Sequence, residues 1–109
     1  MKHIKIIIAS TRDNRRGPKV ANWVLEQSKQ YAGNLAFEII DLKAVNLPLF
    51  NEPKSPYERE YKYNHTKAWS SIITASDGFI FVTPEYNHGY PASLKNAIDY
   101  LYHEWTGKP

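Results

Sequence analysis

Three stretches of the chain have the apolar, β-branched composition of strands. Residues 4–9 and 79–83 are almost continuously apolar, without polar alternation. This pattern is typical of strands in a parallel sheet that helices cover on both faces. Both are therefore predicted as interior strands, and 79–83 as a central one. Residues 35–42 alternate partly, because Glu38 and Asp41 interrupt the apolar run, so this strand is predicted nearer the sheet edge.

The segments between and after these strands contain apolar residues at helical spacing. Residues 18–32 form the first predicted helix, which Gly33-Asn34 stops, and residues 57–76 contain the second. The third begins after Pro91, a residue suited to the first turn of a helix. The residues predicted to share one apolar face are Val20, Trp23, Val24, Gln27 and Tyr31 in the first helix, Ala68, Trp69, Ile72, Ile73 and Ser76 in the second, and Leu94, Ile98, Leu101 and Trp105 in the third.

The resulting order of elements is β-α-β-α-β-α in 109 residues. Strands joined by right-handed helical crossovers form a parallel sheet with helices on its faces. The length suits one domain, which can bury enough surface to fold alone. Residues 43–56 contain three prolines, so regular secondary structure is not expected there. The predicted fold class is a single α/β domain over residues 1–109.

Composition narrows the functional classes. The chain has no cysteine, which excludes disulfides, thiolate metal sites and thiol catalysis. His65 has no second ligand at a suitable spacing, so we interpret it as a surface residue and expect no metal site. No stretch reaches the roughly 20 apolar residues of a membrane helix, and residues 1–9 are unlike a secretory signal. A cytoplasmic protein without a membrane partner is expected.

The formal net charge of +3 raises the question of nucleic acid binding. The only tight basic cluster is Arg12, Arg15, Arg16 and Lys19, whereas the other basic residues are interspersed with Asp and Glu. No nucleic-acid-binding module is recognisable in the sequence. A small phosphate ligand explains one local cluster better than a polyanion does, so no nucleic acid partner is expected.

The loop after the first strand has the character of a phosphate-binding loop. Residues 10–17 read Ser-Thr-Arg-Asp-Asn-Arg-Arg-Gly and lead into the first predicted helix. Free backbone N–H groups and the positive end of the helix dipole favour an anion there, and arginines add charge-assisted hydrogen bonds. The loop matches neither a Walker sequence nor the glycine-rich dinucleotide fingerprint. We expect Ser10 and Arg12 to be functional, and one of Arg15 and Arg16 to be a solvated surface charge.

A second loop follows the strand 79–83 and begins Pro84-Glu85-Tyr86-Asn87-His88. In open α/β sheets, ligands bind in the crevice outside the carboxyl ends of the strands. This loop is therefore a second candidate binding segment. We do not expect Glu85 and His88 to act as an acid–base pair, because nearby loop residues rarely converge on one atom.

The two loops resemble two motifs of the NADPH-dependent FMN reductase family, whose members have a flavodoxin-like fold. Residues 84–99 resemble the signature Pro-Glu-Tyr-Asn…Pro-x-x-Leu-Lys-Asn-Ala-Ile-Asp. Residues 9–17 resemble the phosphate loop Gly-Ser-Thr-Arg-x-x-Arg-x-Gly, with Ala9 in place of the first glycine. The matching residues are Ser10, Thr11, Arg12, Arg15 and Gly17 in the phosphate loop, and Pro84, Glu85, Tyr86, Asn87, Pro91, Leu94, Lys95, Asn96, Ala97, Ile98 and Asp99 in the signature.

The resemblance implies a three-layer α/β/α fold with strand order 2-1-3, in which the two loops face one another. The first loop would hold the phosphate of FMN, and the second would lie along the isoalloxazine ring. The cofactor-binding residues expected on this basis are Ser10, Thr11, Arg12, Arg15 and Gly17 together with Pro84, Glu85, Tyr86 and Asn87. A similar Leu-Pro-Leu segment shapes the active-site rim in the family, so Leu49 and Phe50 either form such a rim or cap the core.

The implied activity is hydride transfer from NADPH or NADH through FMN to a quinone, an azo compound, free flavin or a similar acceptor. Because the flavin N5 carries the hydride, no catalytic side chain is expected. Family members continue into a fourth and a fifth strand, which we expect this chain to lack, so a flavin- or nucleotide-binding module without turnover is the alternative. In the order 2-1-3 the strand 79–83 would leave an apolar edge, which favours a homo-oligomer.

Overall fold

The parallel sheet has three strands, β1 (Lys2–Ile8), β2 (Leu35–Asp41) and β3 (Gly78–Val82), in a computed structural model that describes residues 1–31 and 33–109. The strand order is β2-β1-β3 and both pairings are parallel, which confirms the predicted topology. β1 is the central strand of the described sheet. The prediction that 79–83 is central was wrong, because β3 lies at the sheet edge.

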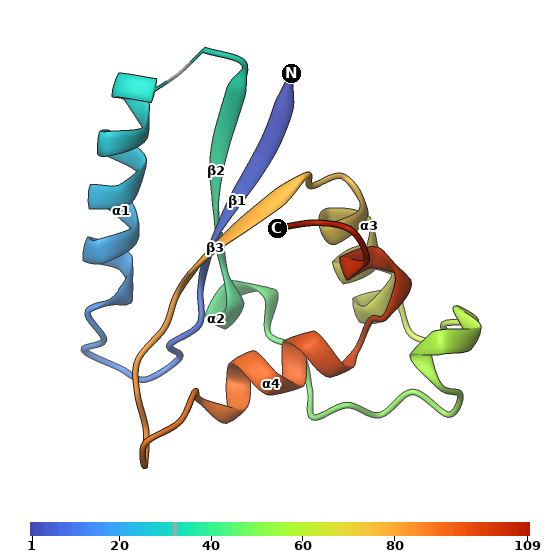
Figure 1. Cartoon of the computed structure of the whole chain (residues 1–109). Coiled ribbons are helices and arrows are strands. Elements are labelled where there is room, and N and C mark those ends of the chain that lie inside the picture. The colour runs from blue at the N-terminus through green and yellow to red at the C-terminus, as the bar shows by residue number, and fades with distance from the viewer. Residues whose placement is uncertain (32) are drawn as a thin grey trace.

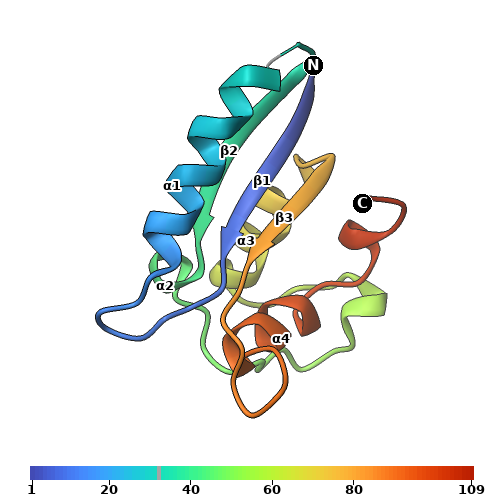
Figure 2. The same ribbon diagram turned by 60° about the vertical axis from the view of Figure 1, so that its left-hand side comes forward.

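Helices cover both faces of the sheet (Figures 1 and 2). α1 (Gly17–Ser28) lies on one face, whereas α2 (Leu42–Val45), α3 (Asn64–Thr74) and α4 (Ala92–Asp99) lie on the other. This arrangement is the expected flavodoxin-like architecture, of which the chain forms a part. Among the described residues, no helix combines the length and apolar character needed to cross a membrane.

The apolar run of β1 supplies both layers of the core. Ile6 and Ile8 pack with Ala21 of α1 on one face. Ile7 belongs to the cluster on the other face, which includes Trp69 of α3. Successive side chains of a strand point to opposite faces, so the part of a strand that is covered on both faces, here Ile6 to Ala9, is apolar at successive positions. Residues 4–9 therefore lack polar alternation because helices cover this strand on both faces, as the sequence suggested.

The buried face of α1 matches the predicted one only in part, because Val24 packs against the core but the large aromatic residues do not. Ala21 and Ser28 are its buried residues, while Trp23 is 63% and Tyr31 is 72% exposed. The small Ala21 allows α1 to approach β1 closely, so the contact stripe is centred on it and the bulky aromatic residues point outward. The helix continues as a 3₁₀ turn over Lys29–Tyr31, and Ala32, its predicted last residue, lies outside the described residues.

The second predicted helix lies within residues 57–76 as expected, whereas the third is shorter than expected. α3 begins at Asn64 and buries Trp69 and Ile73, but Ala68 is exposed. α4 ends at Asp99, so Trp105 lies in a separate 3₁₀ turn and not on this helix. The chain leaves helical geometry after the buried Tyr100, whose hydroxyl donates a hydrogen bond to the carbonyl of Pro48 (2.8 Å).

The proline-containing segment 43–56 is less irregular than predicted. Its start belongs to the short helix α2, because Asp41 caps that helix by accepting a hydrogen bond from the Lys43 N–H (3.0 Å). Phe50 packs edge-on against Tyr100 with the ring centroids 5.1 Å apart, so it caps the core. Leu49 is 82% exposed and does not.

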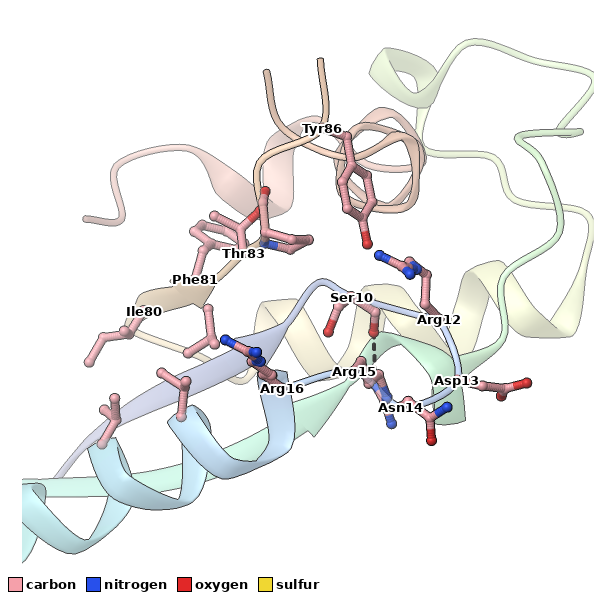
Figure 3. A pocket seen from close by; sticks show the side chains of 15 residues that line it. Ser10, Arg12, Asp13, Asn14, Arg15, Arg16, Ile80, Phe81, Thr83 and Tyr86 are labelled. Atoms are coloured by element: carbon pink, nitrogen blue, oxygen red, sulfur yellow. Dashed lines mark hydrogen bonds between the residues drawn. The ribbon is translucent and has the colours of Figure 1, made fainter. Parts of the chain in front are cut away.

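The carboxyl ends of β1 and β3 bring the two predicted loops together (Figure 3). The Ala9 N–H donates to the carbonyl of Val82 (2.9 Å), which extends the ladder by one residue beyond β1. The Ser93 hydroxyl donates to the carbonyl of Ala9 (2.6 Å) and ties α4 to the same point. The starts of the two loops are therefore held next to each other by these hydrogen bonds.

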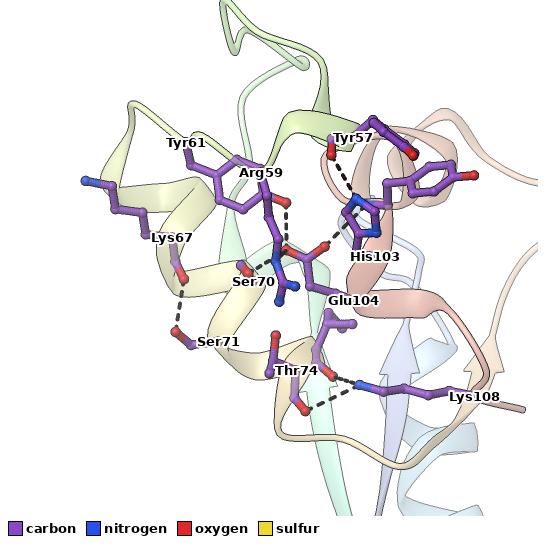
Figure 4. Close-up of polar contacts among 12 residues, drawn as sticks. Tyr57, Arg59, Tyr61, Lys67, Ser70, Ser71, Thr74, His103, Glu104 and Lys108 are labelled. Atoms are coloured by element: carbon purple, nitrogen blue, oxygen red, sulfur yellow. Dashed lines mark hydrogen bonds and ion pairs between the residues drawn. The ribbon is translucent and has the colours of Figure 1, made fainter.

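A buried carboxylate anchors the C-terminal segment to α3 (Figure 4). Glu104 is 3% exposed and accepts hydrogen bonds from the hydroxyls of Tyr61 and Ser70, both at 2.6 Å. Burial disfavours its charged form, but the hydrogen bonds from Ser70 and Tyr61 hold the pKa of Glu104 below its ordinary value. Burial, together with the bond to Glu104, raises the pKa of Tyr61.

The same segment reaches the outer edge of β3. The Lys108 ammonium donates to the carbonyl oxygens of Ile73 (2.9 Å) and Thr74 (3.3 Å) at the C-terminal end of α3. The Phe79 N–H then donates to the carbonyl of Pro109 (2.9 Å). Residues 103–109 thus connect α3 to the edge strand.

We expect Tyr61→Phe to destabilise the fold by roughly 1–3 kcal/mol, because it leaves the buried Glu104 carboxylate with one donor fewer. Urea unfolding followed by circular dichroism measures this change. Tyr57→Phe is the matched control, since Tyr57 is 63% exposed and its hydroxyl makes no hydrogen bond within the described residues. Equal stabilities of the two variants would contradict the anchoring role of Glu104.

Candidate functional site

The two loops enclose a cavity of about 880 Å³ at the carboxyl ends of β1 and β3 (Figure 3). The polar side comes from the loop after β1 and the start of α1. The apolar side comes from α1 and β3. The cavity is lined by Ser10, Arg12, Asp13, Asn14, Arg15, Arg16, Gly17, Val20, Val24, Ile80, Phe81, Val82, Thr83, Pro84 and Tyr86.

Most of the residues predicted to bind a cofactor meet at this cavity, and three do not. Thr11 faces a neighbouring hollow of about 360 Å³ that Lys43 and Ser93 also line. Glu85 and Asn87 lie in the loop after β3, at the turn bridged by Tyr86 and Gly89, where Asn87 has a left-handed backbone (φ 53°). The Glu85 carboxylate accepts a hydrogen bond from the His88 backbone N–H (2.7 Å), which is a turn contact.

Ser10 has the most unusual environment in the cavity. The residue is 4% exposed, and its hydroxyl has no hydrogen-bond partner among the described residues. A buried hydroxyl without a partner is costly. The backbone of Gly17 passes so close that a Cβ at position 17 would lie 2.5 Å from Ser10 Oγ and 2.7 Å from Ile8 Cγ2. Glycine is therefore needed for α1 to begin beside this hydroxyl.

The three arginines of the loop have different environments. Arg12 extends across the cavity toward the hydroxyl of Tyr86, and Arg16 projects into it from the start of α1 (Figure 3). Neither forms an ion pair with any other described residue. Arg15 is instead held by two oxygens of Asp41, at 2.6 Å each. Arg16 is thus the solvent-exposed member of the Arg15 and Arg16 pair.

The electrostatics of the cavity favour an anion. α1 starts at Gly17 with no acidic residue in its first turn and no side-chain cap, so its first N–H groups and its dipole face the loop unopposed. Two cationic side chains, Arg12 and Arg16, line the same space. The arrangement of a free hydroxyl, free N–H groups and guanidinium groups is suited to a phosphate or carboxylate.

Two contributors to the site were missed from the sequence. Arg16 was not among the predicted binding residues, although it lines the cavity. Asp41 was interpreted only as a polar interruption of β2, yet the register pairs it with Ile8, next to the loop. A carboxylate at the carboxyl end of a strand beside an arginine-rich loop was the available signal. No cluster of three or more potential metal ligands occurs in the described part of the chain.

Comparison with known proteins gives one consistent result. A sequence profile described as NADPH-dependent FMN reductase matches residues 2–109. The NAD(P)H-dependent FMN reductase C4B3.06c of Schizosaccharomyces pombe is 49% identical over 97% of this chain and 54% of its own length. A quinone reductase of Pseudomonas putida is 35% identical over 97% of this chain and 55% of its own length. The chain therefore spans about half the length of these relatives.

A solved structure supports the same likeness. FerB, a flavoenzyme NAD(P)H:(acceptor) oxidoreductase from Paracoccus denitrificans, superposes with a TM-score of 0.75 and 26% sequence identity. The superposition covers 100% of this chain and 58% of FerB. The similarity extends over the whole described architecture, including both loops.

We expect Gly17→Ala to lower the free energy of unfolding by about 1–3 kcal/mol, because the new methyl group would overlap Ser10 Oγ and Ile8 Cγ2. Thermal unfolding of the purified chain measures this effect. Gly89→Ala is the control, since a Cβ there has Tyr86 O at 3.9 Å as its nearest contact. Equal melting temperatures of the two variants would contradict the close approach of α1 to Ser10.

Proposed function

The chain belongs to the NADPH-dependent FMN reductase family, and we propose that it binds FMN in the cavity between its two loops and takes part in hydride transfer from NADPH or NADH to an electron acceptor. The chain spans 54% of the length of its relative in S. pombe, so the activity of the full-length relative is a proposal for this chain. The acceptor classes proposed are quinones, azo compounds and free flavin.

The observation that carries the proposal is the buried Ser10 hydroxyl without a partner. A phosphate oxygen at this point would accept a hydrogen bond from it and remove the cost of an unsatisfied buried donor. The first N–H groups of α1 and the guanidinium group of Arg12 line the same volume. The residues present therefore fit the phosphate of FMN.

Each part of the cavity has a proposed role. Ser10, Arg12 and Gly17 would surround the phosphate, with Arg16 as an additional cation, whereas the predicted ligand Thr11 faces the neighbouring hollow. Pro84 and Tyr86 would lie along the ring, and the backbone of Glu85 and Asn87 would hydrogen-bond to its edge. The guanidinium group of Arg15, the remaining predicted ligand, is engaged by Asp41.

FMN, when bound, supplies the hydride chemistry at its isoalloxazine ring, so the chain needs no nucleophile or proton-transfer residue. The task of the protein is to bind, orient and shield. The side chains of Val20, Val24 and Ile80 form an apolar side of the cavity. Tyr86 lies on the opposite side, where its ring would limit access to one face of the flavin.

Flavin binding without turnover is a second candidate function. At the edge of the cavity, Ile80 is 36% and Phe81 is 39% exposed. Water therefore reaches this side of the site, and a reduced flavin there would be accessible to solvent. Purified chain with added FMN separates the two candidates: NADPH or NADH oxidation at 340 nm with a quinone present supports the reductase, whereas binding without oxidation supports the second function.

We expect Arg12→Ala to weaken FMN binding by about 1.5–3 kcal/mol, or roughly tenfold to a hundredfold, because one charged hydrogen bond to phosphate is lost. Riboflavin, which has no phosphate, should bind both proteins equally. Fluorescence titration measures both affinities. Lys19→Ala removes the same charge from an exposed position of α1 outside the cavity and should leave FMN affinity nearly unchanged. Equal FMN affinity of Arg12→Ala and wild type would refute the phosphate assignment.

We propose that the chain forms a homo-oligomer through the edge of β3. This strand is apolar and lies at the sheet edge, with Ile80 and Phe81 partly exposed, and such edges promote association. Sedimentation velocity at micromolar concentration should show a species heavier than 12.6 kDa. A cooperatively melting monomer at that concentration would exclude the oligomer.

A further inference from the structure

Arg15 and Asp41 form a two-pronged ion pair beside the phosphate loop. Arg15 Nη1 donates to Asp41 Oδ1 and Arg15 Nη2 donates to Asp41 Oδ2, both at 2.6 Å. The same Nη1 also donates to the backbone carbonyl of Ser10 at 2.7 Å (Figure 3). The side chains are 15% and 25% exposed, so solvent screens this pair less than it screens a surface ion pair.

These contacts join three parts of the chain at one point. Arg15 belongs to the loop, the Ser10 carbonyl is where that loop leaves β1, and Asp41 is the last residue of β2. Asp41 also accepts the hydrogen bond from the Lys43 N–H that caps α2. The start of the loop is therefore fixed to the neighbouring strand by a planar guanidinium group that cannot rotate without breaking several bonds.

The position of Asp41 is unexpected on charge alone. A carboxylate near an anion-binding loop should repel the anion. Its charge is offset by Arg15, whose hydrogen bonds hold the pKa of Asp41 below its ordinary value despite partial burial. The contribution of Asp41 to the site is therefore sought in its hydrogen bonds and not in its charge.

We propose that Arg15 and Asp41 are positioning residues that hold the Ser10 carbonyl, and hence the Ser10 hydroxyl, in the orientation that receives an anion. This inference rests on the proposed function and assigns Arg15 a structural contact in place of the direct phosphate contact that the sequence motif suggests. Arg12 and Arg16 then supply the cationic groups of the cavity, while Arg15 fixes its shape.

For Asp41→Asn, the proposal and a purely electrostatic effect predict changes of opposite sign in FMN affinity. Asp41→Asn removes a negative charge near the site and frees Arg15, so simple electrostatics predicts tighter FMN binding. Loss of the positioning contact predicts weaker binding, on the order of tenfold, by analogy with the loss of residues that orient metal ligands. FMN titrations of the wild type and of Asp41→Asn distinguish these results.

Glu38→Gln is the matched control. Glu38 lies on the same strand and forms an ion pair with Lys5 of β1, so the substitution also removes a carboxylate that links β1 and β2. It lies three residues before Asp41 and outside the cavity. We expect its FMN affinity to equal that of the wild type, and an equal loss in both variants would overturn the proposal.

Arg15→Lys provides a second variant that keeps the positive charge. A direct phosphate contact tolerates lysine, whereas the two-pronged pair requires the guanidinium fork. We expect Arg15→Lys to lose as much FMN affinity as Asp41→Asn, and the double variant to lose no more than either one. Wild-type affinity in Arg15→Lys, or additive losses in the double variant, would overturn the proposal.

A readout without flavin tests the same pair. Amide hydrogen exchange of residues 10–17 in the flavin-free chain should quicken in Asp41→Asn and Arg15→Lys but not in Glu38→Gln. Unchanged loop exchange would overturn the positioning role. If the wild type bound neither FMN nor inorganic phosphate, the proposed function would fail together with this inference. If it bound FMN and Asp41→Asn bound it equally or more tightly, only the inference would fail.

Discussion

The burial of β1 on both faces and along both edges is the constraint on which the rest of the structure depends. Its side chains belong alternately to the layer under α1 and to the layer under α3 and α4. Its neighbours are β2 and β3. The second half of β1, Ile6 to Ile8, is buried and has no polar side chain, and its carboxyl end leads through Ala9 into Ser10. The polar loop of the candidate site therefore begins where the buried apolar residues of β1 end.

The sequence was sufficient to predict those features that depend on one segment at a time. The apolar run of residues 4–9 indicated a strand covered on both faces, and the loop composition indicated an anion site. The same prediction was wrong for residues 79–83, because Ile80 is 36% and Phe81 is 39% exposed. The strand order and the identity of the expected cofactor came from the likeness to a known family. Composition alone could not reveal that β3 lies at an edge, because side chains report how a strand is covered and not how many neighbours it has.

Features that depend on contacts between distant segments were not predictable in the same way. The inward face of α1 is set by how closely Ala21 fits against Ile6 and Ile8, so the large aromatic residues misled the prediction. Beyond the end of α4, the buried Tyr100 hydroxyl donates to the carbonyl of Pro48, 52 positions earlier. The environment of Arg15 depends on Asp41, 26 positions later. Helical spacing and loop composition contain no information about such partners.

The anchoring of residues 103–109 has a consequence for aggregation. Glu104 and Lys108 hold this segment on α3, while Trp105 packs edge-on against Phe79 with the ring centroids 5.1 Å apart. Local unfolding of this one segment would uncover the ring of Phe79 and its backbone N–H, which donates to the carbonyl of Pro109. Because partial opening requires less free energy than global unfolding, the rate at which the chain aggregates should follow the fraying of its last seven residues and not its melting temperature.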